Sequence, residues 1–474
     1  MSDRNSLKRR IRSRMTETGE SYTSVRQFFL RKAENSRMQN NETFDLQQLL
    51  ERSMAARNVP GGCLIAYKDN EVIDSAVAGT VSIDSDEPIT SDTLFRIGAV
   101  IGPMVATVIM QYVEAGKITL DDPILKHLPD FRTADMDCLR RVTVRHLLSH
   151  THGLDADGYT DESGSTIQDL LDGCADLPSV FEPGKNCSRS AVGYSLLGRL
   201  IEVLEDLTFE EAMGARLFAP LEMDHRWWTS ADIQGASLGH IEDSNRLSVV
   251  NERGREVFKA VGSTLMMPIE ALHKFASVHV HNGLALTGER ILSAASCSEM
   301  RRVQFPDLYS HKWGSHDGFG WVAMRGEHPV FWADNAGYGQ GVRVIILPKQ
   351  GLEMIGCVNR GFTYEVFDDV WGKSGYHTKM TGVVTKSVLQ RRKKVSGTIG
   401  NLAGKYMNNI GHVTIMHDED QLSLTNDVFG VNQMALDMLD DTVAWSSLGM
   451  VEFDSDRKMP SWVKVAGQVY KRSD

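Results

Sequence analysis

Apolar residues recur with two different periods along this chain, and the two periods predict both helices and strands. Over residues 44–54 they return every three or four positions, which is typical of an amphipathic helix. The segment 62–73 instead holds two short β-rich runs on either side of an Asp-Asn pair, and this pattern predicts a hairpin. A second hairpin is predicted over 342–358, because two further β-rich runs flank a Pro-Lys-Gln-Gly turn.

Helical periodicity fills the region between the two hairpins. It is clearest over 105–113, 142–149 and 194–204, and the first of these segments closes at Gly116, a typical helix C-cap. Strand pairs at both ends of a mainly helical region predict one antiparallel sheet that is assembled from both ends and packed by helices. We therefore expect an α+β fold.

Polar segments divide the chain into three expected parts. Residues 1–42 form a basic appendage and linker, with two short helices over 1–37, and residues 43–390 form the main domain. After a run of four basic residues, short alternating runs with polar turns occupy 398–474. Their spacing predicts a small all-β, barrel-like domain.

The composition is that of a globular chain, with 474 residues and 42% hydrophobic residues, and a mean hydropathy of −0.25. No run of eighteen apolar residues occurs, and no apolar run follows the basic N-terminus as a secretory signal requires. We expect a cytoplasmic protein with no membrane partner. The six cysteines are scattered without a C-x-x-C pair, so we expect buried, reduced thiols.

Charge is distributed unevenly. Residues 1–37 carry ten Lys/Arg and four Asp/Glu, a net charge of +6, which leaves −17 for the rest because the total is −11. A body this acidic is not expected to bind nucleic acid, whose affinity for proteins comes largely from phosphate contacts. The basic segment is expected either to dock on the acidic body or to bind a protein partner, and both readings stay open.

Several blocks of the main domain resemble the serine β-lactamase and penicillin-binding-protein superfamily, nearest to its class C β-lactamase, esterase and D-aminopeptidase branch. The similarity spans about 44–361 and implies an antiparallel sheet packed by helices. The C-terminal segment resembles the lipocalin-like domain often appended to this branch. The blocks that carry the resemblance are DTLFRIG at 92–98, VEAGKITLDDP at 113–123, VRHLLSHT at 144–151, PG at 183–184, GYSLLG at 193–198, GFGW at 318–321 and IILP at 345–348.

Enzymes of this family attack a carbonyl with the serine of a Ser-x-x-Lys motif, whose lysine accepts the serine proton. In this chain the positions that match the serine and the lysine are Ala99 and Gly102. The resemblance therefore implies a site without its nucleophile and base.

The other two family motifs are also substituted. Tyr-x-Asn, which supplies a phenol and a substrate-holding amide, is matched by Arg189 and Ala191. Lys-Thr-Gly or His-x-Gly is matched by Ala333, Asp334 and Asn335. Arg189 places a fixed cation where the family has a phenol, and we expect it either to pair with Asp334 or to anchor a carboxylate or phosphate.

Two further features concern the same cleft. Tyr338 and Gln340 occupy positions where the family carries small residues, so they are expected to narrow the cleft or to fill the core. His150 and His152 suggest a metal motif at first sight, but no histidine follows the acidic residues of this segment. We expect no metal and no cofactor.

These substitutions favour a non-hydrolytic pseudoenzyme that binds a small molecule in the cleft or a protein at its surface. One alternative is an enzyme with a rebuilt, non-covalent site, in which Arg189, Asp334 and Asn335 would orient a substrate for proton transfer, cyclisation or a lyase step. A second alternative is residual hydrolase or esterase activity through a displaced serine. The candidates for that serine are Ser91, Ser188 and Ser190.

Overall fold

The computed structural model describes most of the chain from residue 45 onward. The expected appendage 1–42, the basic run at 391–394 and Tyr338 lie outside the described residues. The described ranges are 45–155, 164–228, 234–243, 246–250, 254–305, 316–324, 329–337, 339–361, 364–373, 399–408, 411–418, 421–426, 431–438, 443–446, 449–454, 459–465 and 468–473.

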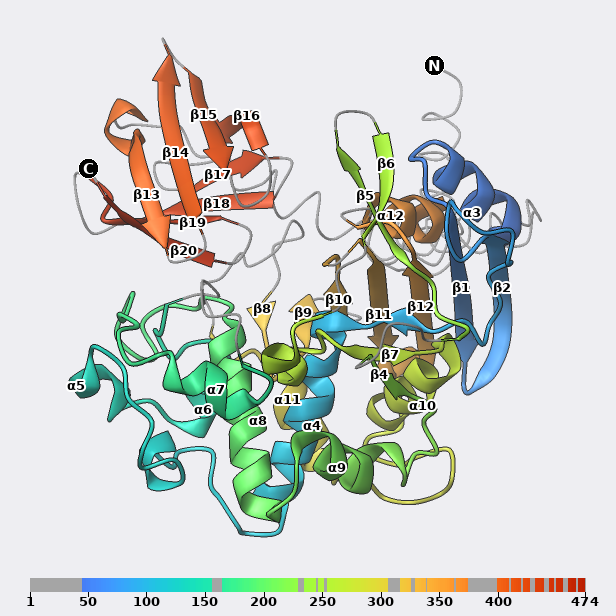
Figure 1. The fold of residues 1–474 in the computed structure, drawn as a ribbon, viewed down its shortest axis with the longest axis horizontal. Coiled ribbons are helices and arrows are strands. Elements are labelled where there is room, and N and C mark those ends of the chain that lie inside the picture. The colour runs from blue at the N-terminus through green and yellow to red at the C-terminus, as the bar shows by residue number, and fades with distance from the viewer. Residues whose placement is uncertain are drawn as a thin grey trace, which may run out of the picture. The chain divides into compact units, whose positions relative to one another are not determined.

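A seven-stranded antiparallel sheet organises the main domain, with the strand order β2-β1-β12-β11-β10-β9-β8 (Figure 1). The first strand of the domain pairs with the last, and Cys63 lies opposite Cys357. This pairing confirms the prediction of one sheet built from both ends. The strands are β1 (Gly61–Lys68), β2 (Glu71–Gly79), β8 (His316–Asp317), β9 (Val322–Met324), β10 (Val330–Asn335), β11 (Gly341–Leu347) and β12 (Leu352–Val358).

Both predicted hairpins are confirmed, and their turn residues explain them. Asp69 and Asn70 link β1 to β2 with φ values of +50° and +70°, the left-handed conformation that a tight hairpin requires and that these residue types tolerate. Gly351, with φ of +60°, closes the turn between β11 and β12.

Helices cover both faces of the sheet and create two hydrophobic layers. On one face, α3 (Leu46–Ala55) and α12 (Tyr364–Lys373) pack against the strands. On the other face lie α4 (Gly102–Glu114), α8 (Ala191–Glu205) and α10 (Ile269–Val280). Trp332 belongs to the first layer and Ala333 to the second, so successive residues of β10 face opposite layers.

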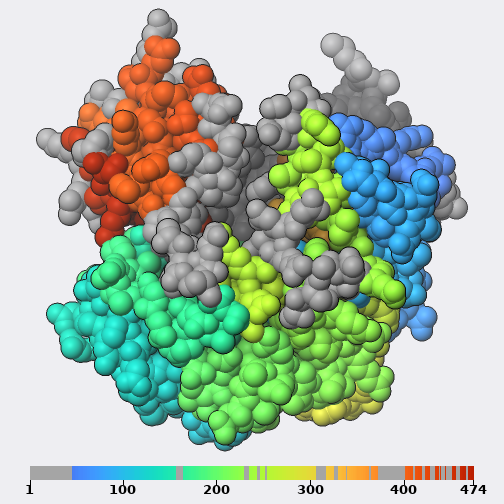
Figure 2. All heavy atoms as spheres, viewed as in Figure 1, coloured from blue at the N-terminus to red at the C-terminus, as the bar shows by residue number. Residues whose placement is uncertain are grey.

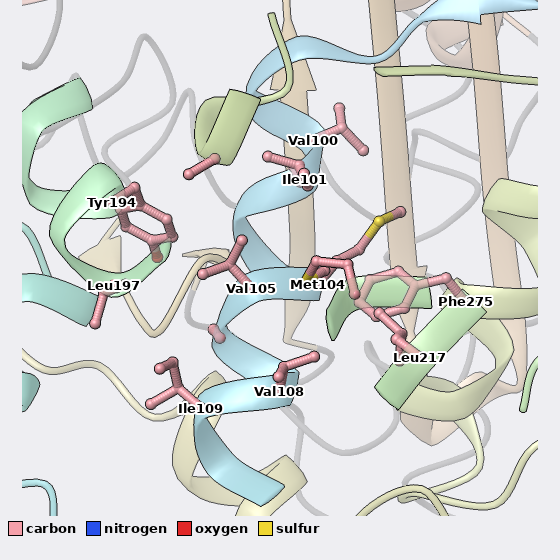
Figure 3. Packing of buried hydrophobic residues seen from close by; sticks show 14 of the residues in the cluster. Val100, Ile101, Met104, Val105, Val108, Ile109, Tyr194, Leu197, Leu217 and Phe275 are labelled. Atoms are coloured by element: carbon pink, nitrogen blue, oxygen red, sulfur yellow. The ribbon is translucent and has the colours of Figure 1, made fainter. Parts of the chain in front are cut away.

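Helix α4 runs through the larger layer and is buried on nearly every side. Val105 points toward Tyr194 and Leu197 of α8, whereas Val108 points to the other side of α4, toward Leu217 (Figure 3). A helix with apolar residues all round is typical of a buried central element. The remaining helices are α5 (Met136–Leu139), α6 (Val144–Leu148), α7 (Ile167–Asp172), α9 (Phe209–Met213) and α11 (Ala294–Arg301).

Two small sheets complete the main domain. One has the order β3-β7-β4 and the other is the hairpin β5–β6. On the face shown in Figure 2, the segments drawn in cyan and green form one continuous packed surface. The strands are β3 (Phe95–Arg96), β4 (Arg226–Trp227), β5 (Gly239–Asp243), β6 (Arg246–Val250) and β7 (Leu265–Met267).

The C-terminal region is a closed antiparallel barrel of strands β13 to β20, which confirms the predicted barrel-like domain. Its first and last strands pair through Tyr406 and Arg472. The barrel strands are β13 (Gly404–Asn408), β14 (Gly411–Asp418), β15 (Gln421–Asn426), β16 (Val431–Met438), β17 (Val443–Ser446), β18 (Gly449–Phe453), β19 (Trp462–Val465) and β20 (Gln468–Arg472).

All six cysteines are buried and free, as the sequence predicts. None of the helices in the described part of the chain is long and apolar enough to cross a membrane.

Candidate functional site

A cavity of about 350 Å³ opens beside the start of α4. Four of its walls come from segments far apart in the sequence: the start of α4, the start of α8, the β8–β9 turn and the end of β10. Its lining residues are Gly98, Ala99, Ile101, Gly102, His150, Arg189, Ser190, Ala191, Tyr194, Phe258, Val261, Ser263, Asp317, Gly318, Gly320 and Asn335.

Ala99 lies in a short 3₁₀ turn, Gly98–Ile101, that leads directly into α4. The backbone at Gly98 has a φ of +50°, and a β-carbon there would lie 2.2 Å from Oδ1 of Asn335. Only glycine therefore fits at this position while Asn335 keeps its place. The turn brings the Ala99 position to the wall of the cavity, and the side chain it offers is a methyl group.

Gly102 stands at the first residue of α4, one turn further on. A β-carbon at Gly102 would lie 3.6 Å from Cε1 of Tyr194, an ordinary van der Waals distance. The structure therefore leaves room for the first carbon of a larger side chain at Gly102. Crowding therefore does not explain the glycine at this position.

Arg189 is fixed by an ion pair at the start of α8, where Ser190 is the N-cap residue. Its Nη2 lies 2.9 Å from Oδ1 of Asp317, whose side chain is only 3% exposed. Burial disfavours the charged guanidinium, but the carboxylates of Asp317 and Asp334 outweigh that cost and raise the pKa of Arg189 above its ordinary value. Arg189 is therefore a permanent cation at the cavity wall.

The expectation that Arg189 pairs with Asp334 is wrong. Asp334 forms an ion pair with Arg343 at 3.3 Å, and Arg343 also contacts Asp368 of α12 at 2.8 Å. The reason is the alternation of β10: Asn335 faces the cavity, whereas Asp334 points to the opposite layer. Of the positions that match the third family motif, only Asn335 lines the cavity.

Asp317 is a site residue that sequence reasoning did not identify. The thiol of Cys187 donates to its Oδ2 at 3.4 Å, so the carboxylate holds a second polar group besides Arg189. Burial and the charge of Asp317 raise the pKa of the Cys187 thiol, which keeps it protonated. The signal was present in the sequence, because Asp317 directly precedes the Gly-Phe-Gly-Trp block that carries the family resemblance.

Tyr194 is the phenol of this site, but it is not poised for proton transfer. Its hydroxyl donates to the carbonyl oxygen of Leu148 at 3.1 Å, and its ring stacks on His150 with centroids 4.8 Å apart. Burial raises the pKa of the Tyr194 hydroxyl above its usual value, so the group stays neutral.

Other expected site residues lie elsewhere. Gln340 is buried and bonds the backbone of Arg96 and of Ser237, so it fills the core instead of narrowing the cleft. His152 is buried, with its pKa lowered to about 3 by burial, and its Nδ1 accepts from the backbone of Leu154. Within the described residues, no three metal-ligating side chains come together.

Comparisons with known proteins identify the family of this chain. The chain belongs to the Beta-lactamase family, whose model matches residues 46–373. It is 29% identical to penicillin-binding protein 4 of Amycolatopsis lactamdurans over 349 residues, covering 69% of this chain and 89% of that protein. It is 28% identical to the esterase EstB of Burkholderia gladioli over 206 residues, which cover 40% of this chain and 52% of that protein.

Solved structures extend the similarity beyond the main domain. The crystal structure of SurE superposes with a TM-score of 0.72 at 22% identity, over 90% of this chain and 98% of that one. The octameric penicillin-binding protein homologue from Pyrococcus abyssi superposes with a TM-score of 0.64 at 20% identity, over 91% and 99% of the two chains. At these identities the similarity shows the shared fold.

Proposed function

We propose that this chain is a non-hydrolytic member of the Beta-lactamase family whose cavity binds a small molecule. The observation that carries the proposal is the methyl side chain of Ala99 at the cavity wall, at the position that matches the family nucleophile. A methyl group has no lone pair and no acidic proton, so it cannot form an acyl-enzyme.

The groups around Ala99 support the same conclusion. Gly102 offers no side chain that could accept a proton. Arg189 stands where the family has its phenol and is held by Asp317 at 2.9 Å. A guanidinium that stays charged cannot act as a base or deliver a proton near neutral pH.

The two enzymatic alternatives find less support. A rebuilt non-covalent site needs Asp334, which is engaged by Arg343 on the opposite face of β10. A displaced serine needs a base, yet the hydroxyl of Ser190 donates to the backbone oxygen of Asp155 and that of Ser188 accepts from the backbone N–H of Val469. Neither serine has the Ser-base hydrogen bond that activates a nucleophile.

A labelling experiment tests the absence of acyl chemistry. The purified protein is incubated with a fluorophosphonate or a fluorescent penicillin, and its intact mass is measured beside that of an active class C β-lactamase. We expect the β-lactamase to gain the mass of one adduct and this protein to gain none. A single stoichiometric adduct on any serine of this protein would overturn the proposal.

Ligand binding is tested separately. Metabolite mixtures are screened for an increase in melting temperature, because a ligand that binds only the folded state stabilises it by mass action. We expect at least one mixture to raise the melting temperature in a concentration-dependent way. No shift with any mixture would contradict a binding role for the cavity.

We also propose roles for the other two parts. The barrel would be a lipocalin-like domain, and the basic segment 1–37 would bind an acidic protein partner in the cytoplasm. Deleting residues 1–37 is then expected to leave the melting temperature of the body unchanged. A lower melting temperature would instead indicate that the segment docks on its own acidic body.

A further inference from the structure

The cavity has an apolar side and a polar side. Ile101, Phe258 and Val261 contribute hydrocarbon surface, whereas Arg189 and Asn335 contribute polar groups. Pockets that bind small molecules commonly combine an apolar lining with a few placed polar groups, which fix the orientation of the ligand.

Arg189 presents a hydrogen-bond donor that no described residue satisfies. Nη2 is used by Asp317, while Nε is buried and has no acceptor among the described residues. The ion pair with Asp317 holds the planar guanidinium in place, so the N–H of Nε also has a fixed direction. A buried donor without an acceptor is rare in folded proteins because its loss of hydration is not repaid.

Asn335 presents a second donor of the same kind from another element. Its Nδ2 is buried and has no acceptor among the described residues. Its side chain packs so closely on Gly98 that only glycine is accommodated there, and this contact fixes the amide at the cavity wall. The two unsatisfied donors therefore come from the start of α8 and the end of β10, and both residues line one cavity.

We propose, on the basis of the binding function above, that the cavity binds a small carboxylate, with its carboxylate oxygens accepting hydrogen bonds from Arg189 and Asn335 and its apolar part against Ile101, Phe258 and Val261. A carboxylate has two acceptor oxygens and no donor, which matches two unsatisfied donors. One of these donors is on a guanidinium, and charge-assisted hydrogen bonds are stronger than neutral ones. A carboxylate is therefore favoured over an amide or an ester of the same shape.

The carboxylate of Asp317 does not accept a hydrogen bond from Nε of Arg189. One oxygen of Asp317 accepts from Arg189 and the other accepts from Cys187. Asp317 is thus an orienting partner for Arg189, and it leaves Nε without an acceptor among the described residues.

The test compares matched ligands by isothermal titration calorimetry on the full chain. The probes are phenylacetate and hexanoate, each beside its primary amide, which has the same shape without the charge. We expect the carboxylates to bind with dissociation constants below about 10 mM and the amides to bind at least tenfold more weakly. Equal binding of acids and amides, or no binding of either acid, would overturn the proposal.

Variants test whether Arg189 and Asn335 are the residues that bind the carboxylate. Asn335→Asp keeps the shape and replaces the donor by a negative charge, so it is expected to weaken phenylacetate binding at least tenfold. Arg189→Gln is expected to do the same, and Asn335→Leu covers the case in which the Arg189 variant fails to fold. The control is Asp334→Asn on the same strand, whose side chain faces the other layer. It should leave phenylacetate binding within twofold.

The outcomes separate this inference from the proposed function. Acid and amide binding equally well, with no effect of Asn335→Asp, would overturn the carboxylate preference and leave a non-hydrolytic binding protein. A covalent adduct in the labelling experiment would overturn the proposed function whatever the titrations show. Loss of phenylacetate binding in Asp334→Asn, as large as in Asn335→Asp, would overturn the assignment of the donors.

Discussion

Arg189 and Asp317 are joined by an ion pair of 2.9 Å although 128 residues separate them in the sequence. The pair lies at the wall of the same cavity as Ala99. It fixes a cation at the cavity wall, and the buried Nε of this cation has no acceptor among the described residues. The chemistry of the site follows from this contact, and so do the first two predictions.

Restoring the nucleophile and its base alone is expected to restore little activity. In Ala99→Ser/Gly102→Lys the attacking and activating groups return, but Arg189 cannot deliver a proton to the leaving group. We expect nitrocefin hydrolysis to stay within a few-fold of the wild-type background. Adding Arg189→Tyr should raise kcat/KM above that of the double variant. Efficient turnover by the double variant would show that the rest of the site is intact.

Removing the carboxylate of the ion pair is expected to destabilise the main domain. Asp317→Asn leaves the partly buried cation of Arg189 without its counter-charge, and we expect a loss of about 2 kcal/mol in the free energy of unfolding. Urea denaturation measures it. The control is Asp137→Asn, which breaks an exposed pair with Arg140 and should cost less than about 0.5 kcal/mol. Equal losses in the two variants would contradict the prediction.

The contact between Gly98 and Asn335 predicts that alanine at position 98 is more destabilising when Asn335 is present than when it is replaced. Gly98→Ala would place a β-carbon 2.2 Å from Oδ1 of Asn335 in a backbone with φ of +50°, so we expect a loss of about 3 kcal/mol. Gly116→Ala is the control, because its φ is +67° but nothing lies within 4 Å, and it should cost only about 1 kcal/mol.

The double variant Gly98→Ala/Asn335→Gly separates the two causes. It removes the collision and keeps the backbone cost, so its unfolding free energy should return to near that of Gly116→Ala. Denaturant midpoints give the comparison. If Asn335→Gly relieved none of the loss, the side-chain contact would not be its source.

Stability is expected to fall with acidification because of two buried histidines. Burial lowers the pKa of His152 and of His279 to about 3, whereas an unfolded histidine titrates near 6.5. The unfolded state therefore takes up protons first, and stability present above pH 6.5 is lost as the pH falls toward 3. Each histidine contributes at most about 1.4 kcal/mol per pH unit in that window.

Urea midpoints between pH 7 and pH 4.5 test this prediction. His279→Gln keeps a polar group for Thr107, whose Oγ1 lies 3.2 Å from the imidazole Nε2, and should make the pH dependence shallower. His417→Gln at an exposed position should leave it as in the wild type. An unchanged pH dependence in His279→Gln would show that this histidine does not titrate on unfolding.

The sequence by itself determined the elements and the family. Helical periodicity located the helix 46–55 and the buried helix α4, and β-rich runs around Asp69-Asn70 located a hairpin, because these signals are local and depend on backbone geometry. Blocks that flank the substituted motifs identified the fold. The match of Ala99 and Gly102 to the family's serine and lysine positions stays a prediction, and it rests on the DTLFRIG block directly before them.

Only the tertiary structure decided which polar residues share the cavity. Both faces of β10 are covered by hydrophobic layers, so the run Phe331-Trp332-Ala333 shows no alternation that would tell which neighbour, Asp334 or Asn335, faces the site. The partner of Arg189 depends on where the topology brings the β8–β9 turn, a long-range contact that no local pattern encodes. Arg189 pairs with Asp317 because oppositely charged groups attract most strongly at short distance. The packing of the sheet and its helices brings these two side chains together.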